Sequence, residues 1–341
     1  MLAALDAFLL SFGLPSAEES ALLRACLVED ESARRDRTNA DLLAALTAAD
    51  AGRRWMLPLL AERLDRDGRL DGAEGIRLRA AALHETGRSA TFDRITAQVL
   101  AVLGEAGCAP MLSRGQALAL SAYPRSALRH RHDLDALVGG AGVAAGAAAL
   151  VQAGLGRTET GVQGGTLLAH PSGLRIHLHA RPLPGPASSF GMAQLRDGAM
   201  VERIDGVSFA VPEPAALLLH VLLLPACTAG TRLAWAADAA MAITRTPIAW
   251  ERVAAIGGAD ACDVLARLDY LAETLGVAVP GAVRARLRTT IAGLDPAARE
   301  VALARARRRR GARAMLRHAR GFGATAGLLR WLIAPVRRTP A

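Results

Sequence analysis

The chain has 341 residues, of which 52% are hydrophobic and 4% aromatic, and it carries a formal net charge of +9. This apolar content excludes an intrinsically disordered chain, and the length suffices for two domains or for one domain with a helical extension. The charge is local, because residues 301–341 contain eleven arginines and no acidic residue, so that the first 300 residues carry −2 (+9 less +11). The basic character therefore belongs to the C-terminal tail.

The first 107 residues are predicted to be helical throughout. Residues 1–12 are apolar but contain Asp6 and lack a basic start, which indicates a first amphipathic helix rather than a signal peptide. Ser16 with Glu19 three residues later is a capping box that begins the next helix. Apolar residues recur every three or four positions in four further segments, residues 39–50, 53–66, 72–87 and 91–107.

The pattern changes after residue 107. A short apolar run at 109–112 precedes a helix at 116–124, a strand at 133–138 and a helix rich in Ala and Gly. Two hairpins follow, at 166–181 around a Pro-Ser-Gly turn and at 200–211 around an Asp-Gly turn. In the strand at 174–179, Leu174, Ile176 and Leu178 alternate with Arg175, His177 and His179, which predicts one apolar face and one basic, imidazole-bearing face.

Helical patterns return from residue 213 and include an Arg-rich helix at about 296–318. We therefore expect an α+β fold, in which a small mixed β-sheet lies between two helical blocks. The expected domains are an N-terminal helical region (1–107), an α/β core (108–211) and a C-terminal helical region with the Arg-rich tail (212–341).

Composition also bears on the compartment. Cys26, Cys108, Cys227 and Cys262 lie far apart without a C-x-x-C pair, which favours buried, reduced thiols in a cytoplasmic protein. The charge-free run 136–156 has 14 Ala or Gly among its 21 residues and gains too little from lipid to span a membrane. No transmembrane segment is expected.

The glycines of this run resemble a dinucleotide-binding turn only superficially. Gly140, Gly142 and Gly146 form G-x-G-x-x-x-G, one residue longer than the fingerprint, although Glu159 falls near the position of its acid. Hairpins follow in place of a second strand–helix–strand unit. We interpret the small residues as allowing the helix to pack closely on the sheet.

Two aspartates in the preceding strand carry the stronger signal. Asp133 and Asp135 are two apart, so both carboxylates lie on one side of the strand, where they can bind Mg²⁺. The motif is short, and the alternative is a pair of strand-end acids neutralised by Arg129 and Arg131.

The order of residues around these aspartates is similar to that of a known family. The relevant residues are Leu112, Arg114 and Gly115, then Tyr123-Pro124, then Arg129, Asp133 and Asp135. Together with "GLRIHLHARP", "PEPAALLLHVLLL" and "RLAWAADAAMAI", they resemble the bacterial uncharacterised nucleotidyltransferase family of the polymerase-β-like superfamily, over about residues 90–275. The resemblance implies a sheet of the nucleotidyltransferase palm type.

It also implies an activity, the Mg²⁺-dependent (or Mn²⁺-dependent) transfer of NMP from an NTP to an unidentified protein, peptide or RNA acceptor. The implied roles are metal binding and catalysis by Asp133 and Asp135, catalysis by His177, and nucleotide binding by Arg114, Gly115, Gln116 and Arg129.

The chain departs from the family at its third catalytic carboxylate, where it has His177. A neutral imidazole is a poor Mg²⁺ ligand but can accept a proton near neutral pH. Glu159, Glu202 and Asp205 lie in neighbouring strands or turns and are candidate substitutes. The alternative function is a catalytically inactive nucleotide-binding or scaffold protein.

Three further features have competing interpretations. The histidines at 130, 132, 177 and 179 could form a transition-metal site with Asp133, but we favour solvent-facing strand edges. His220 is expected to be a buried residue behind the site, and Asp238 a buried partner of Arg232 or a nucleotide contact. The Arg-rich tail 305–338 could contact a polyanion, lie on an anionic membrane or form a solvated helix face.

Overall fold

The structure is a computed structural model that describes residues 13–28, 38–47, 51–162, 165–183, 190–224, 229–298 and 301–302. The expected helices at 1–12 and 296–318 and the Arg-rich tail at 305–338 lie wholly or mostly outside these ranges, as does Cys227. Cys26, Cys108 and Cys262 are buried, as expected. Within the described part of the chain, no helix is both long and apolar enough to cross a bilayer.

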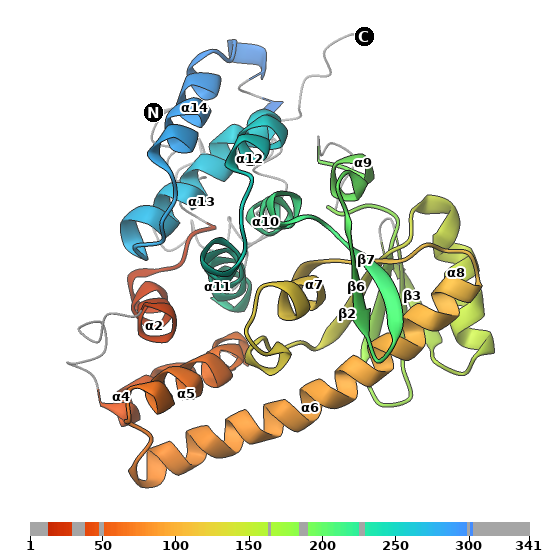
Figure 1. Ribbon diagram of the computed structural model, residues 1–341, viewed down its shortest axis with the longest axis horizontal. Coiled ribbons are helices and arrows are strands. Elements are labelled where there is room, and N and C mark those ends of the chain that lie inside the picture. Colours follow the sequence, from red (N-terminus) through yellow and green to blue (C-terminus); the bar gives the residue numbers. More distant parts are fainter. Residues whose placement is uncertain are drawn as a thin grey trace, which may run out of the picture.

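The fold is α+β, with a seven-stranded mixed sheet among helices (Figure 1). Its strand order is β3-β4-β5-β2-β1-β7-β6. Their bounds are Arg157–Val162 (β3), Gly165–Ala169 (β4), Arg175–His179 (β5), Asp133–Leu137 (β2), Met111–Leu112 (β1), Val207–Val211 (β7) and Met200–Ile204 (β6). The pairs β2–β5 and β1–β7 are parallel and the others antiparallel.

Helices precede, interrupt and follow the strands. Before the sheet come α2 (Ala17–Leu27), α4 (Asn39–Thr47), a 3₁₀ turn (Ala51–Met56), α5 (Leu57–Arg66) and α6 (Gly72–Glu105). Within it come α7 (Arg114–Ser121), a 3₁₀ turn (Ser126–Leu128), α8 (Gly140–Gln152) and α9 (Met192–Arg196). After it come α10 (Pro214–Leu223), α11 (Ala229–Arg245), α12 (Trp250–Gly257), a 3₁₀ turn (Gly258–Asp260), α13 (Ala261–Thr274) and α14 (Gly281–Ala292).

Local sequence signals explain several of these elements. The capping box at α2 is present, because Ser16 Oγ accepts from the Glu19 N–H and the Glu19 carboxylate accepts from the Ser16 N–H. Both expected hairpins form, as β4–β5 and β6–β7. The Ala- and Gly-rich segment is α8, and a Cβ at Gly146 would lie 2.7 Å from Leu103 Cδ2 of α6. The small residues therefore allow close helix packing, as the sequence predicted.

Two expectations were wrong. The helices predicted at 72–87 and 91–107 are one 34-residue helix, α6, because Gly87 continues the helical backbone and Glu85 pairs with Arg88 across that turn. Such a helix is about 50 Å long, and Figure 1 shows it running from beside α4 and α5 to the sheet. Strand β3, at the edge of the sheet, was not predicted, because its sequence RTETGV lacks apolar alternation.

The helices at the two ends of the chain pack together. Arg232 of α11 makes two bonds of 2.8 and 2.9 Å to the Glu19 carboxylate of α2, which is 1% exposed. The hydroxyls of Ser20 and Tyr270, on α2 and α13, lie 2.8 Å apart in the interior. Together these helices cover one side of the molecule, and the sheet lies on the other (Figure 1).

Candidate functional site

The parallel pairing of β2 with β5 builds the site. Asp135 lies opposite His177 in this register, and side chains alternate between the faces of each strand. One face carries Leu134, Ala136, Ile176 and Leu178, which are fully buried beneath α6 and α8. The opposite face carries Asp133 and Asp135 from β2, and His177 and His179 from β5.

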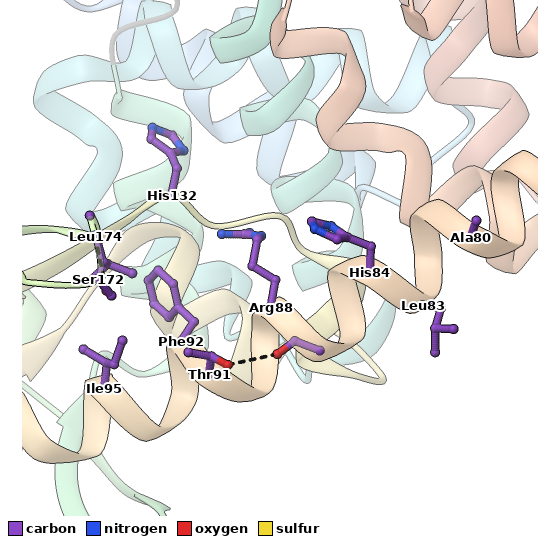
Figure 2. Close-up of a pocket in the computed structure, with 12 residues that line it drawn as sticks. Ala80, Leu83, His84, Arg88, Thr91, Phe92, Ile95, His132, Ser172 and Leu174 are labelled. Carbon is purple, nitrogen blue, oxygen red and sulfur yellow. Dashed lines mark hydrogen bonds between the residues drawn. The ribbon is translucent and has the colours of Figure 1, made fainter.

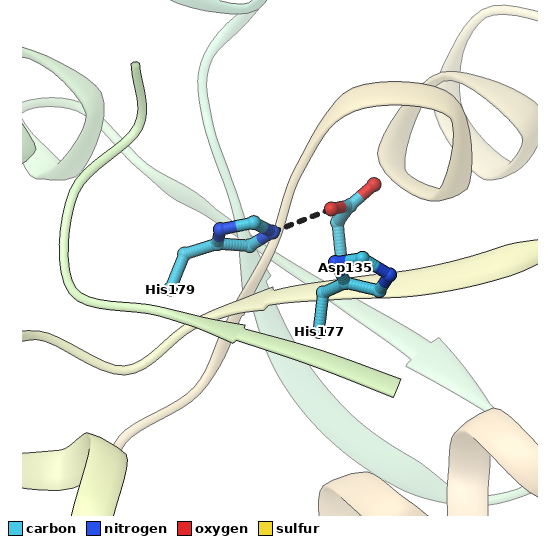
Figure 3. Close-up of side chains that lie close together, drawn as sticks. All are labelled: Asp135, His177 and His179. Atoms are coloured by element: carbon cyan, nitrogen blue, oxygen red, sulfur yellow. Dashed lines mark hydrogen bonds and ion pairs between the residues drawn. The ribbon is translucent and has the colours of Figure 1, made fainter. Parts of the chain in front are cut away.

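Asp135 is the centre of this polar face. His179 Nε2 lies 2.5 Å from Asp135 Oδ1, and Arg114 Nη1 donates to the same oxygen from 3.0 Å (Figure 3). His177 stands beside them, with its ring stacked on that of His179 at a centroid distance of 5.7 Å. His177 Nε2 lies 3.8 Å from Asp133 Oδ2, is buried and has no hydrogen-bond partner.

The surroundings set the charge of these groups. Burial alone would raise the pKa of Asp135, but the Arg114 charge and the contacts with His179 and His177 outweigh it and hold this pKa well below its usual value. Burial lowers the pKa of His177, and the attraction of Asp135 and Asp133 offsets this only in part. Near neutral pH, Asp135 is therefore a carboxylate and His177 a neutral imidazole.

The beginning of α7 faces this group. Arg114, its first residue, has φ of 53°, in the left-handed region that L side chains rarely adopt. The buried hydroxyl of Ser113, which precedes the helix, has no hydrogen-bond partner. The first N–H groups of a helix have no partner within it, so that this end of α7 is suited to an anion.

Gly115 and Arg129 lie against each other. A Cβ at Gly115 would come within 2.9 Å of Arg129 Nη2, so that any other residue there would require the guanidinium to shift. Arg129 in turn makes bonds of 2.7 and 2.9 Å to the two carboxylate oxygens of Asp238, which also accepts from the Tyr123 hydroxyl at 2.8 Å. Burial lowers the pKa of Arg129, but the Asp238 charge outweighs it and raises that pKa above its usual value.

These contacts correct two expectations. The buried partner of Asp238 is Arg129, whereas Arg232 pairs with Glu19. Arg131 does not neutralise the aspartates of β2, because it pairs with Asp93 at 2.5 Å and donates to Gln116 Oε1 at 2.8 Å. The Gln116 side chain is 2% exposed and bonded in this interior network, away from Asp135.

The candidate acids for the third position lie on other strands. Glu159 is on β3 and Glu202 on β6, each three strands from β2, which corresponds to roughly 14 Å at about 4.8 Å per strand. Asp205 lies beyond Glu202, in the β6–β7 turn. In the described ranges, the group of side chains that could hold a metal ion consists of Asp135, His177 and His179, whose ligand atoms lie within 4.8 Å of one another.

The expectation of solvent-facing histidines was wrong for three of the four, because the His130 side chain is also only 23% exposed, whereas that of His132 is 50% exposed. The His177 and His179 side chains are 21% and 14% exposed and lie beside Asp135. His130 pairs with Glu85 at 3.0 Å, and His132 stacks on Trp55 at a centroid distance of 4.9 Å.

A comparison with protein families now adds to this geometry. The profile of the family described as "Uncharacterised nucleotidyltransferase" matches residues 40–276, more than two thirds of the chain. The chain belongs to the uncharacterised nucleotidyltransferase family. No curated protein and no solved structure matches it.

The match begins about fifty residues before the motifs that suggested it. In this nucleotidyltransferase-family chain it includes α4, α5 and α6 as well as the sheet and the helices through α13. The helices α4, α5 and α6 therefore belong to the same matched region as the sheet, whereas α2 lies before it.

A groove of about 790 Å³ lies next to the site, between α6 and the β4–β5 turn (Figure 2). His132, the residue before Asp133, forms part of its wall. Its other lining residues include Arg88, Thr91, Phe92, Ile95 and Leu174. The candidate site is thus accompanied by a mostly apolar depression on the side of Asp133.

His220 lies behind the site, on α10. It is fully buried, and its Nε2 lies 2.9 Å from the Pro182 carbonyl oxygen, to which the neutral ring donates. Burial lowers its pKa to about 3. The expectation of a buried residue behind the site is confirmed.

Sequence reasoning missed two functional contacts. His179 was predicted to share a face with His177, but its bond to Asp135 follows only from the β2–β5 register, which the sequence does not reveal. The Arg129–Asp238 pair joins residues 109 positions apart, with no local signal.

Proposed function

We propose that this protein is a metal-dependent nucleotidyltransferase that transfers NMP from an NTP to an acceptor. One observation carries the proposal: the parallel β2–β5 pairing places Asp133, Asp135 and His177 on one face, opposite Arg114 at the beginning of α7. The family match supports it.

The residues present fit a divalent cation. Asp133 and Asp135 supply two carboxylates on one face, and the unpartnered nitrogen of His177 adjoins Asp133. When bound, such an ion neutralises charge that develops on the transferred phosphoryl group and aligns it for in-line attack.

The protein's own residues would position the substrates. The triphosphate would lie at the N-terminus of α7, where Arg114 and the N–H groups of Gly115 and Gln116 face it. Arg129 would act mainly through its place over Gly115, because Asp238 already occupies its guanidinium.

The reaction forms one bond and breaks another at the α-phosphorus. The acceptor nucleophile bonds to that phosphorus while the bond to the bridging oxygen breaks, and pyrophosphate leaves with the bonding electron pair. The acceptor's proton passes to a base. His177 fits this role when its Nε2 does not hold the metal ion, because the ring is neutral and that nitrogen has no hydrogen-bond partner in the protein.

Calorimetric titration tests the proposal. Each NTP is titrated with Mg²⁺ or Mn²⁺ into the wild type and into the Asp133→Ala/Asp135→Ala variant. Binding that needs metal and is lost in the variant supports a nucleotide site, and absence of binding by folded wild type would refute it.

A second candidate is a nucleotide-binding or scaffold protein without turnover. The observation that favours it is the imidazole of His177 at the family's third carboxylate position, with Glu159 and Glu202 each three strands from β2. Binding of an NTP without release of pyrophosphate, across a panel of protein, peptide and RNA acceptors, would support this alternative.

A further inference from the structure

The donor atoms beside Asp135 are mixed in kind. Asp135 provides carboxylate oxygen, and His177 and His179 provide imidazole nitrogen, all within 4.8 Å of one another (Figure 3). Ligands of one ion lie closer than this, since metal–nitrogen and metal–oxygen distances are about 2.0–2.2 Å. Side-chain rotation would have to close the difference, and both histidines start from the same strand with their rings stacked.

His177 is the residue of this cluster whose hydrogen bonding is incomplete. Its Nε2 is buried and has no hydrogen-bond partner, whereas His179 Nε2 has Asp135 Oδ1 at 2.5 Å. Leaving a buried polar group unpaired costs about 1–3 kcal/mol, so such groups require an explanation. A cation shared with Asp135 would provide the missing partner.

Charge and ligand type both disfavour Mg²⁺ as the preferred ion. Three carboxylates would supply a charge of −3, but here Asp133 and Asp135 supply −2, and Arg114 lies 3.0 Å from Asp135 Oδ1. Mg²⁺ depends on hard oxygen ligands, while imidazole nitrogen suits zinc and its transition-metal neighbours. Two imidazoles with one carboxylate form a donor set that transition metals use commonly.

We propose that Asp135, His177 and His179 form a binding site for a divalent transition-metal ion, with Asp133 within reach of the same ion. The inference deepens the proposed function, since it names the class of ion at that site, but the metal binds without nucleotide. His177 is then a metal ligand rather than a free base whenever the ion is bound.

The test uses metal alone. The full chain is stripped with EDTA and titrated with Co²⁺, Zn²⁺, Mn²⁺ and Mg²⁺ by calorimetry, and Co²⁺ is also followed by its visible absorption. His177→Gln and His179→Gln remove one imidazole each, and His170→Gln is the matched control on the β4–β5 turn, where the ring bonds to Ser172. Circular dichroism checks that each variant is folded.

We expect Co²⁺ and Zn²⁺ to bind the wild type and the control equally, and each site variant about tenfold or more weakly. His177→Asp restores a third carboxylate, so that Mg²⁺ should gain affinity while Co²⁺ loses it. Pulsed EPR of the Mn²⁺-loaded wild type should show coupling to imidazole nitrogen, a readout that needs no variant.

The proposal is overturned if Co²⁺ and Zn²⁺ fail to bind, if the site variants bind them like the control, or if equimolar Mg²⁺ displaces them. The NTP titration described above is separate. Failure to bind NTP leaves the metal result intact, and NTP binding without any transition-metal binding sinks the metal inference alone.

Discussion

Removal of the Asp238 side chain should lower the free energy of unfolding substantially. Its carboxylate and the Arg129 guanidinium are 6% and 15% exposed and share two bonds, and Tyr123 donates a third. Asp238→Ala leaves a buried cation without its counter-charge and a buried hydroxyl without its acceptor. Breaking a buried pair in this way costs about 3–5 kcal/mol, a large fraction of a typical stability of roughly 5–15 kcal/mol.

Urea unfolding, followed by circular dichroism, measures this loss as a shift in the midpoint. The control is Glu251→Ala, because Glu251 is 81% exposed and pairs with Arg286, which is 53% exposed. Such a surface pair is worth about 0–1 kcal/mol. A loss below about 1 kcal/mol for Asp238→Ala would refute the reasoning, because it would be no larger than the loss expected for a surface pair.

A double variant distinguishes the structural role of the Arg129–Asp238 pair from a role of Arg129 in NTP binding. Arg129→Met/Asp238→Leu removes both charges, and replacement of a buried pair by apolar residues is often neutral or stabilising. The double variant should therefore be more stable than Asp238→Ala. If it also binds NTP like the wild type, Arg129 is not a direct phosphate contact.

Three further variants test other parts of the structure. Burial lowers the pKa of His220 from 6.5 to about 3. Between these two pH values the unfolded chain binds a proton at this residue and the folded chain does not. The free energy of unfolding therefore decreases as the pH falls below 6.5. Between pH 7 and pH 5, His220→Gln should lose about 2 kcal/mol less stability than the wild type, and parallel urea curves would contradict this. A Cβ at Gly165 would lie 2.2 Å from the Leu178 carbonyl oxygen, so Gly165→Ala should separate β4 from β5 and lower the melting temperature, and an unchanged melting temperature would rule that out. Arg114→Ala should weaken NTP binding by about tenfold to a hundredfold, since it removes a charge-assisted contact worth about 1.5–3 kcal/mol, and equal calorimetric affinity would exclude Arg114 as a phosphate contact.

Elements with local signals were predictable from the sequence. The Ser16 capping box, strand β2 and both hairpins follow from residues within a few positions of one another. Strand β3 was missed because its polar residues lie at the sheet edge, where no apolar face is needed. The continuity of α6 was missed because a single glycine, Gly87, weakens a helical pattern without ending the helix.

The candidate site likewise has features that the local sequence predicts and features that depend on long-range packing. The shared face of Asp133 and Asp135 follows from their spacing, because alternation is a local property of a strand. The bonds of Asp135 to His179 and Arg114 depend on strand register and on the placement of α7. Arg129 and Arg131 were indistinguishable in sequence as neutralising partners, yet they pair with Asp238 and Asp93 on different helices.

The pairing of α2 with α11 and α13 has a consequence for how the chain folds during synthesis. Glu19 meets Arg232, 213 residues later, and Ser20 meets Tyr270, 250 residues later. While the ribosome adds roughly 5–20 residues per second, α2 remains without these partners for many seconds after it has emerged. α2 also packs on α5, which is synthesised early, but the part of its apolar face that packs on α11 stays exposed during that interval. A nascent chain stalled before α11 should therefore be a target for chaperones, because α2 has not yet packed against α11 and α13.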